Sequence, residues 1–234
     1  MIGICRPRWV ISATFEGGGA LSIRHPSRLA NRKGAVLTPK TTLTPQAGIG
    51  PDGRHIEYEL DVPMKRILIP ADKLNARVHA LGEEITEMYR GTVPLLVSIL
   101  KGGVVFLTDL MRAVRIPHHI DFLQLSSYSG GKKTTGTVRL LSDLGTNIAG
   151  RDVIIVEDIV DTGLTLTYLL KQLEIRQPNT LRVCALLNKV EARQVEVPID
   201  FVGFEIPNEF VVGYGLDFDE KYRNLPYIGV LDAP

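Results

Sequence analysis

The sequence predicts an α/β fold in which helices flank a mostly parallel central sheet. Short runs of aliphatic and β-branched residues alternate along the chain with longer segments whose apolar residues recur every three or four positions. The run at residues 153–156 is apolar throughout, as expected for a strand that is buried on both faces of a parallel sheet. Strands that alternate with helices imply right-handed crossovers between parallel strands.

The composition is that of an ordinary globular protein. The 234 residues are 44% hydrophobic and 23% charged, and their formal net charge is +1. This length suffices for one α/β domain, or for a domain and a tail. The near-neutral charge gives no sign of a polyanionic partner, so nucleic acid is not expected. Cys5 and Cys184 make no disulfide framework, and no segment is typical of a membrane span or signal peptide, so we expect a cytoplasmic protein without a membrane partner.

Residues 1–63 differ from the rest of the chain. They contain the run Gly17 to Gly19, scattered prolines and no sustained apolar period. We expect this N-terminal extension to be poorly ordered and the folded domain to cover residues 64–234. Met64 begins the run M-K-R-I-L-I-P and is the expected initiator; the alternative is that the extension is a real tail of unknown use.

The predicted elements follow in order from Arg66. A strand at residues 66–69 precedes a helix at 71–89, whose apolar residues recur at helical spacing and which Gly91 ends. A strand at 94–100, a helix at 103–114 and a strand at 119–126 come next. The remaining expected elements are a helix at 163–173 and strands at 138–142, 153–156, 181–187, 201–205 and 228–231.

The segment V-I-I-V-E-D-I-V-D-T-G, residues 153–163, predicts a binding site at the end of a buried strand. A leucine-rich helical stretch follows it, so we interpret residues 158–163 as a strand-to-helix turn. Ligands of open α/β sheets bind beyond the carboxyl ends of the strands, where a helix N-terminus offers unpaired N–H groups to an anion. Thr162, Thr165 and the local amides can therefore hold a phosphate.

Three carboxylates lie beside this predicted phosphate site: Glu157, Asp158 and Asp161. They oppose a phosphate electrostatically unless they serve hydroxyls, a divalent cation or a proton transfer, and a ribose diol with Mg²⁺ would resolve the conflict. Glu157 and Asp158 are adjacent, so only the end of a strand lets both reach one ligand. The alternative interpretation is that all three are solvated turn residues.

Two further segments are glycine-rich. The stretch S-I-L-K-G-G, residues 98–103, ends one strand and opens a helix, so its glycines let the backbone approach an oxyanion and Lys101 adds a positive charge. The loop S-S-Y-S-G-G-K-K-T-T-G, residues 126–136, is too small and polar to pack a core, and we expect it to move when the site is empty. A plain turn and an ordinary hairpin loop are the alternatives.

Together these segments resemble the type I phosphoribosyltransferases, and the hypoxanthine-guanine branch in particular. Residues 153–163 match the motif that binds phosphoribosyl pyrophosphate (PRPP), and the resemblance runs from about Met64 to the C-terminus. It implies the type I fold, with a small hood built from the terminal segments and a flexible active-site loop. It also implies transfer of the 5-phosphoribosyl group from PRPP to N9 of hypoxanthine, and of guanine, in purine salvage. Mg²⁺ and a homodimer or homotetramer are expected.

The resemblance assigns a role to each matching residue. Asp161 is expected to be the general base. The ribose 5-phosphate is expected to contact Glu157, Asp158, Asp161, Thr162, Gly163, Leu164 and Thr165; some relatives carry Lys where this chain has Leu164. The pyrophosphate ligands are expected to be Lys101, Gly102 and Arg223, with a cis peptide between Leu100 and Lys101. The flexible loop contributes Ser127 and Tyr128, the purine ligands are Lys189, Phe210 and Val211, and the Mg²⁺ ligands are Glu157, Asp158 and Asp217.

Two other functions remain open from the sequence. A regulator that senses PRPP or nucleotides could use the same fold, and the basic residues of the extension leave room for it, although such proteins often lack an acid at position 161. A phosphoribosyltransferase that prefers xanthine, or one that acts on uracil, is a nearer alternative. Lys189 argues for a 6-oxopurine over adenine, because an ammonium group suits a carbonyl acceptor and leaves the amino group of adenine unpaired.

Overall fold

The computed structural model describes residue 58 and residues 60–127 and 138–232. The predicted N-terminal extension lies outside the described residues, apart from Tyr58 and residues 60–63. The chain divides into two units, Met1–Lys40 and Thr41–Pro234, and every described residue belongs to the second.

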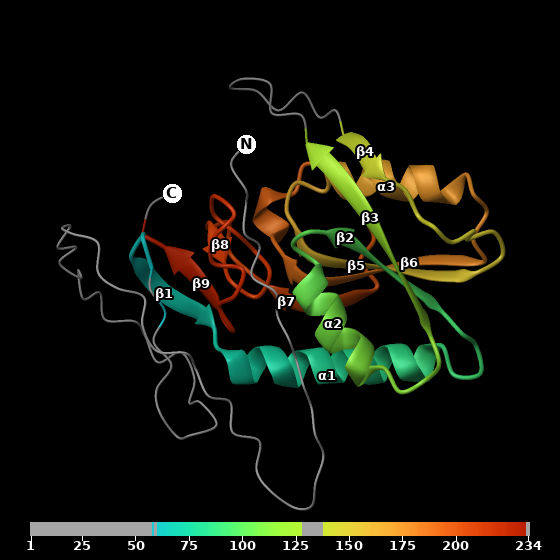
Figure 1. Ribbon diagram of the computed structural model, residues 1–234, viewed down its shortest axis with the longest axis horizontal. Coiled ribbons are helices and arrows are strands. Elements are labelled where there is room, and N and C mark those ends of the chain that lie inside the picture. Colours follow the sequence, from blue (N-terminus) through green and yellow to red (C-terminus); the bar gives the residue numbers. More distant parts are fainter. Residues whose placement is uncertain (1–57, 59, 128–137, 233–234) are drawn as a thin grey trace, which may run out of the picture. The chain divides into compact units, whose positions relative to one another are not determined.

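The centre of the fold is a six-stranded sheet (Figure 1). Its strand order is β4-β3-β2-β5-β6-β7, and all neighbouring strands are parallel except β3 and β4, which form an antiparallel edge. The strands are β2 (Leu95–Leu100), β3 (His119–Ser127), β4 (Val138–Ser142), β5 (Asp152–Val160), β6 (Thr180–Asn188) and β7 (Phe201–Glu205). The predicted α/β class with a mostly parallel sheet is therefore confirmed.

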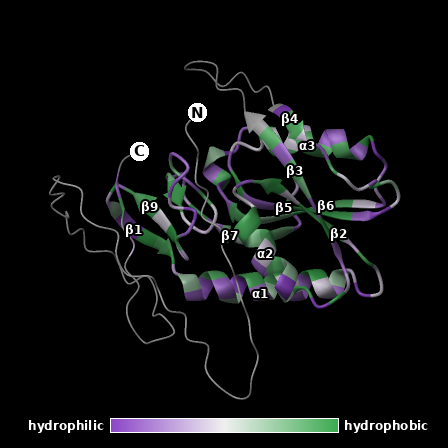
Figure 2. Cartoon of the chain, viewed as in Figure 1, coloured by the Kyte–Doolittle hydropathy of each residue, from purple (hydrophilic) through white to green (hydrophobic). Residues whose placement is uncertain are grey.

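Helices cover both faces of this sheet. On one face, α1 (Ala71–Met88) and α2 (Val104–Ala113) share a core with Ile154 and Val156 of β5; on the other, α3 (Leu164–Glu174) packs against Val153 and Ile155. These four strand residues are fully buried, as the apolar run predicts. Figure 2 shows the corresponding hydropathy, with hydrophobic residues along the central strands and alternating bands on α1.

A second, smaller sheet forms the hood. It is antiparallel, with the order β1-β9-β8, and consists of β1 (Met64–Ile69), β8 (Val211–Val212) and β9 (Ile228–Leu231). Its own apolar cluster contains Val212, Leu231 and three residues of the intervening loop, Tyr222, Leu225 and Tyr227. Leu60 and Val62 pack against this cluster, so the described end of the predicted extension is part of the hood's packing.

The main departure from the predicted elements is the length of β5. The prediction ended this strand at Val156 and interpreted residues 158–163 as a turn, and this was wrong because β5 continues to Val160. Its polar end stays in the sheet by pairing with β6, where Glu157 lies opposite Ala185 and Val160 opposite Asn188. The turn is reduced to residues 161–163. The two-residue strand β8 and the short 3₁₀ helix η1 (Val190–Ala192) were not predicted.

Candidate active site

The glycine-rich loop after β2 lies directly against the end of β5. The peptide between Leu100 and Lys101 is cis, as the resemblance predicted. A Cβ atom at Gly102 would lie 1.8 Å from Oδ2 of Asp158, so any larger residue there would have to displace this carboxylate. This close approach places the carboxylate of Asp158 at the backbone of the predicted pyrophosphate loop.

The two adjacent acids of β5 both have raised pKa values. Oε2 of Glu157 is buried and has no hydrogen-bond partner among the described residues. Burial, with the nearby charge of Asp158, raises the pKa of Glu157 well above its usual range. Asp158 accepts a hydrogen bond from the amide of Ile159 at 2.9 Å, yet burial raises the pKa of this carboxyl to about 6. Neither is a solvated turn residue, and such a pair fits a divalent cation or hydroxyl donors.

The next strand brings a buried lysine to the third acid. Asp161 follows β5 with 53% of its side chain exposed, whereas only 9% of the Lys189 side chain, directly after β6, is exposed. The Lys189 amide donates to the carbonyl of Val160 at 3.0 Å, and its Nζ lies 3.9 Å from Oδ2 of Asp161. Because β5 and β6 are parallel neighbours, their carboxyl ends place a proton acceptor beside a cation that donates hydrogen bonds.

The turn between β5 and α3 leaves a helix N-terminus open. Gly163 precedes α3 with a φ of 84° and has no side chain to cap the helix, and the amide of Leu164 donates a hydrogen bond to Oγ1 of Thr162 at 3.4 Å. The segment after η1 stabilises this turn, because the carbonyl of Thr162 accepts hydrogen bonds from the amides of Gln194 and Val195 at 2.9 and 3.2 Å. Leu164 and Thr165, at the start of α3, are exposed. The backbone amides at the start of a helix fit an anion such as a phosphate.

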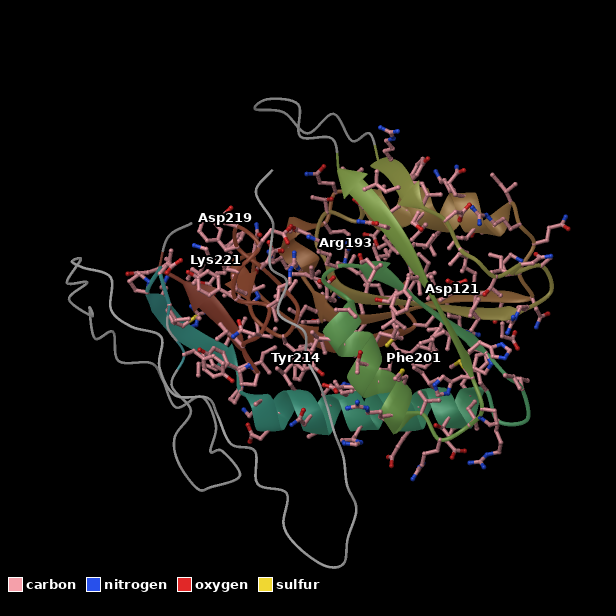
Figure 3. The ribbon with its side chains drawn as sticks, viewed as in Figure 1. Asp121, Arg193, Phe201, Tyr214, Asp219 and Lys221 are labelled. Atoms are coloured by element: carbon pink, nitrogen blue, oxygen red, sulfur yellow. The ribbon has the colours of Figure 1, made fainter. Side chains whose placement is uncertain are left out.

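Arg193 approaches this turn from the loop after η1 (Figure 3). Its Nη1 would lie 3.2 Å from a Cβ atom at Gly163, and its Nη2 donates to Asn188. Nη1 is buried without a hydrogen-bond partner among the described residues. The guanidinium group therefore adds a positive charge behind the open helix end.

The loop that precedes β9 in the hood contacts the glycine-rich loop after β2. Nη2 of Arg223 lies 2.8 Å from Oδ1 of Asp217, and its Nη1 donates to the carbonyl of Gly215 at 2.8 Å. Gly215, with a φ of 102°, allows this loop to touch the pyrophosphate loop, since a Cβ there would lie 2.2 Å from the carbonyl oxygen of Gly102. Both loops thus meet at one place.

Glu220 connects the two predicted pyrophosphate cations. Its Oε2 lies 2.7 Å from Nζ of Lys101, and its Oε1 lies 3.4 Å from Nη2 of Arg223. An anion with two arms can therefore bridge these cations, which come from segments far apart in the chain. A pyrophosphate is such an anion.

Phe210 and Phe218 form an aromatic pair on the hood. Phe210 is 40% exposed, and its ring centroid lies 5.7 Å from that of Phe218 at an interplanar angle of 82°. Val211, the next residue, is buried in β8. An exposed aromatic face beside a strand edge can stack on a planar ring.

Comparison with known proteins agrees with this geometry. The family model described as "Phosphoribosyl transferase domain" matches residues 70–219.

The chain belongs to the phosphoribosyltransferase family.

Its similar relatives are named as hypoxanthine or hypoxanthine-guanine phosphoribosyltransferases. One from Mycobacterium avium is 51% identical over 175 residues, which cover 72% of this chain and 86% of the relative. One from Salmonella typhimurium is 48% identical over 165 residues, or 70% of this chain and 93% of the relative. A crystal structure of the Bacillus anthracis hypoxanthine-guanine enzyme matches with a TM-score of 0.69 and 44% identity, covering 71% of this chain and 98% of that one. The resemblance stated from the motifs is confirmed.

Most residues predicted to form the phosphoribosyltransferase site lie at the carboxyl ends of β2, β5 and β6 or on the hood. Two expectations fall at the edge of the described structure: Ser127 ends β3, where its backbone pairs with Val138, and Tyr128 lies outside the described residues. Three residues near the site were not predicted from the sequence: Glu220, Phe218 and Arg193. Phe218, in the run L-D-F-D, could have been noted as an aromatic beside a predicted ligand; the other two carry no local signal.

The described residues contain neither a metal site built by protein ligands alone nor a helix that could cross a membrane. No three His, Cys, Asp or Glu side chains among them converge into a site that would hold a metal ion by protein ligands alone. Mg²⁺ commonly binds through one or two carboxylates together with substrate phosphates, so the pair formed by Glu157 and Asp158 still fits it. The helices of this part of the chain are also too short or too polar for any of them to cross a membrane.

Proposed function

We propose that this phosphoribosyltransferase transfers the 5-phosphoribosyl group of PRPP to N9 of hypoxanthine and of guanine, with release of pyrophosphate, in purine salvage. The observation that carries the proposal is the 3.9 Å approach of Asp161 and Lys189 at adjacent strand ends. The reaction needs a proton acceptor, here Asp161, close to a residue that binds the purine, here Lys189. The names of the relatives support the same reaction.

Lys189 selects the base. Its ammonium group has only donors, so it binds the 6-oxo group of hypoxanthine or guanine and has no acceptor for the amino group of adenine. A site built to hydrogen-bond one substrate group rejects an analogue that lacks it, because its own buried group is left unpaired. Phe210 stacks on the purine, and the backbone of Val211 bonds its edge.

Asp161 acts as the general base. Its carboxylate takes the proton from N7 as N9 attacks C1 of the ribose, while the bond to pyrophosphate breaks. The negative charge also faces the positive charge that develops on the ribose ring, so one group serves proton transfer and electrostatic stabilisation. Its exposure leaves it accessible to the substrate.

The two ends of PRPP occupy the two loops. The 5′-phosphate lies at the start of α3, where residues 161–165 hold it mainly through backbone amides, so Leu164 needs no charge. The pyrophosphate lies between Lys101, Gly102 and Arg223. The loop with Ser127 and Tyr128 closes over the site and excludes water from the glycosyl cation.

Glu157 and Asp158 hold the ribose hydroxyls, directly or through Mg²⁺, and Asp217 holds a second Mg²⁺ at the pyrophosphate. The buried, unpartnered Oε2 of Glu157 and the raised pKa of Asp158 support a positive ligand here. When bound, Mg²⁺ supplies charge neutralisation to the leaving pyrophosphate. By resemblance, we propose that the enzyme is a homodimer or homotetramer.

The test is formation of IMP from hypoxanthine and GMP from guanine, with PRPP and Mg²⁺ near neutral pH. The proposal predicts turnover of both bases. If the enzyme turns over neither hypoxanthine nor guanine, the proposal is refuted. A regulator without activity would instead bind PRPP and give no nucleotide.

A further inference from the structure

The hood loop that carries Asp217 and Arg223 has an unfavourable backbone. Asp219, Glu220 and Tyr222 adopt φ values of 53°, 60° and 73°, a left-handed conformation that residues other than glycine rarely take. Such residues persist where the surrounding structure holds them. The geometry of the pyrophosphate end of the site therefore depends on contacts made by this loop.

Two of these contacts come from residues that precede β1. Tyr222 is 6% exposed, and its hydroxyl accepts a hydrogen bond from the amide of Val62 at 3.1 Å. Lys221, labelled on the hood in Figure 3, forms an ion pair with Asp61. The side chains of two successive loop residues are thus held by two successive residues of one short segment.

Residues 60–63 are themselves held by a backbone hydrogen bond and by apolar packing. The carbonyl of Pro63 accepts the amide of Asp232 at 3.1 Å, which ties the segment to the end of β9. Leu60 and Val62 pack on the apolar cluster that contains Tyr222, Leu225 and Tyr227. Residues 60–63 can therefore transmit rigidity from the hood sheet to the loop.

We propose that residues 60–63, through Asp61 and Val62, are a positioning element for the pyrophosphate end of PRPP. They touch no substrate; they fix Lys221 and Tyr222, which directly precede Arg223 and thereby set the distance between Arg223 and Asp217. This inference rests on the proposed function. Loosening the segment changes the affinity for PRPP and leaves the purine pocket, built by Lys189 and Phe210, unchanged.

The experiment measures kcat and KM for PRPP and for hypoxanthine in the full chain with Mg²⁺. Asp61→Asn removes a largely exposed ion pair, and we expect the KM for PRPP to rise about twofold. Tyr222→Phe removes the acceptor of the Val62 amide and keeps the ring, and we expect a rise of about fivefold. The double variant is expected to show a rise of about tenfold, with the KM for hypoxanthine within about twofold of the unaltered chain.

Two controls accompany these variants. Glu87→Gln removes an ion pair of similar exposure between Glu87 of α1 and Arg90, which follows this helix, and is expected to change neither KM. Asp61→Glu keeps the charge and is expected to restore the PRPP affinity lost in Asp61→Asn. An unchanged KM for PRPP in the double variant overturns the inference, as does an equal rise of both KM values, which indicates general loosening of the fold. If the unaltered chain gives no IMP or GMP, the proposed function fails instead.

Discussion

Replacement of Asp158 by Asn is expected to stabilise the ligand-free protein while it weakens substrate binding. Burial raises the pKa of Asp158 from 3.8 to about 6, so the folded protein holds this charge at a cost. At about 1.4 kcal/mol for each pKa unit, the shift corresponds to about 3 kcal/mol at a pH well above 6. The Asn side chain removes this cost and keeps an oxygen to accept the amide of Ile159.

The sign of the pH dependence follows from the direction of the shift. The pKa of Asp158 is higher in the folded than in the unfolded protein, so the carboxyl is neutral in both states only well below pH 3.8, and no penalty exists there. The penalty grows as the pH rises from 3.8 through about 6 and is complete above it. The advantage of Asp158→Asn should therefore be largest in alkaline buffer and vanish in acid.

Thermal unfolding in the presence of a chelator and without substrate measures this effect. A gain of about 1 to 3 kcal/mol should raise the Tm of the variant by about 3 to 10 °C at about pH 8, and the two proteins should converge at about pH 3, below both pKa values. Added PRPP and Mg²⁺ should stabilise the unaltered chain more than the variant. The reasoning is refuted if the variant is less stable at about pH 8, or if its advantage does not depend on pH.

Three further substitutions test individual parts of the site. Asp161→Asn should lower kcat by about 10² to 10⁴ because the proton acceptor is lost, while equilibrium binding of PRPP stays near that of the unaltered chain; a large loss of PRPP affinity would contradict the assignment. Lys189→Gln should lower kcat/KM for hypoxanthine by at least about tenfold and narrow the preference over adenine, and unchanged base selectivity in the same assay would count against its role. Glu220→Gln removes a carboxylate that competes with pyrophosphate for Lys101 and Arg223, so product inhibition by pyrophosphate should become about two- to fivefold stronger. An unchanged inhibition constant would show that the ion pairs of Glu220 do not influence pyrophosphate binding.

The sequence predicted those parts of the fold that depend on local pattern. The helices α1 and α2 follow from apolar residues at helical spacing, and the glycine-rich loop follows from its place between a strand and a helix. The strand β5 was predicted too short because Glu157 and Asp158 interrupt its apolar run, whereas pairing with β6 keeps them in the sheet. Whether charged residues are buried in a strand depends on the neighbouring strands and on the ligand that binds there. The local sequence pattern shows neither the neighbouring strands nor the ligand.

Some residues of the candidate site could likewise be predicted from local sequence pattern, and others could not. Asp161 and Lys189 follow strands that the sequence identifies, so their meeting at one edge of the sheet was predictable. Glu220 was not, because its bridge between Lys101 and Arg223 needs a loop in which three residues other than glycine have positive φ values. Nothing in the run D-F-D-E-K-Y-R indicates that conformation. The support that Val62 gives to Tyr222 joins segments 160 positions apart and has no local signal.

The most direct test of the account is the choice of purine by the unaltered chain. Purified protein with PRPP and Mg²⁺ is offered hypoxanthine, guanine and adenine separately, and the formation of each nucleotide is followed. The account predicts IMP and GMP, with kcat/KM for adenine lower by at least about two orders of magnitude. No turnover with hypoxanthine and guanine, or a preference for adenine, would contradict it.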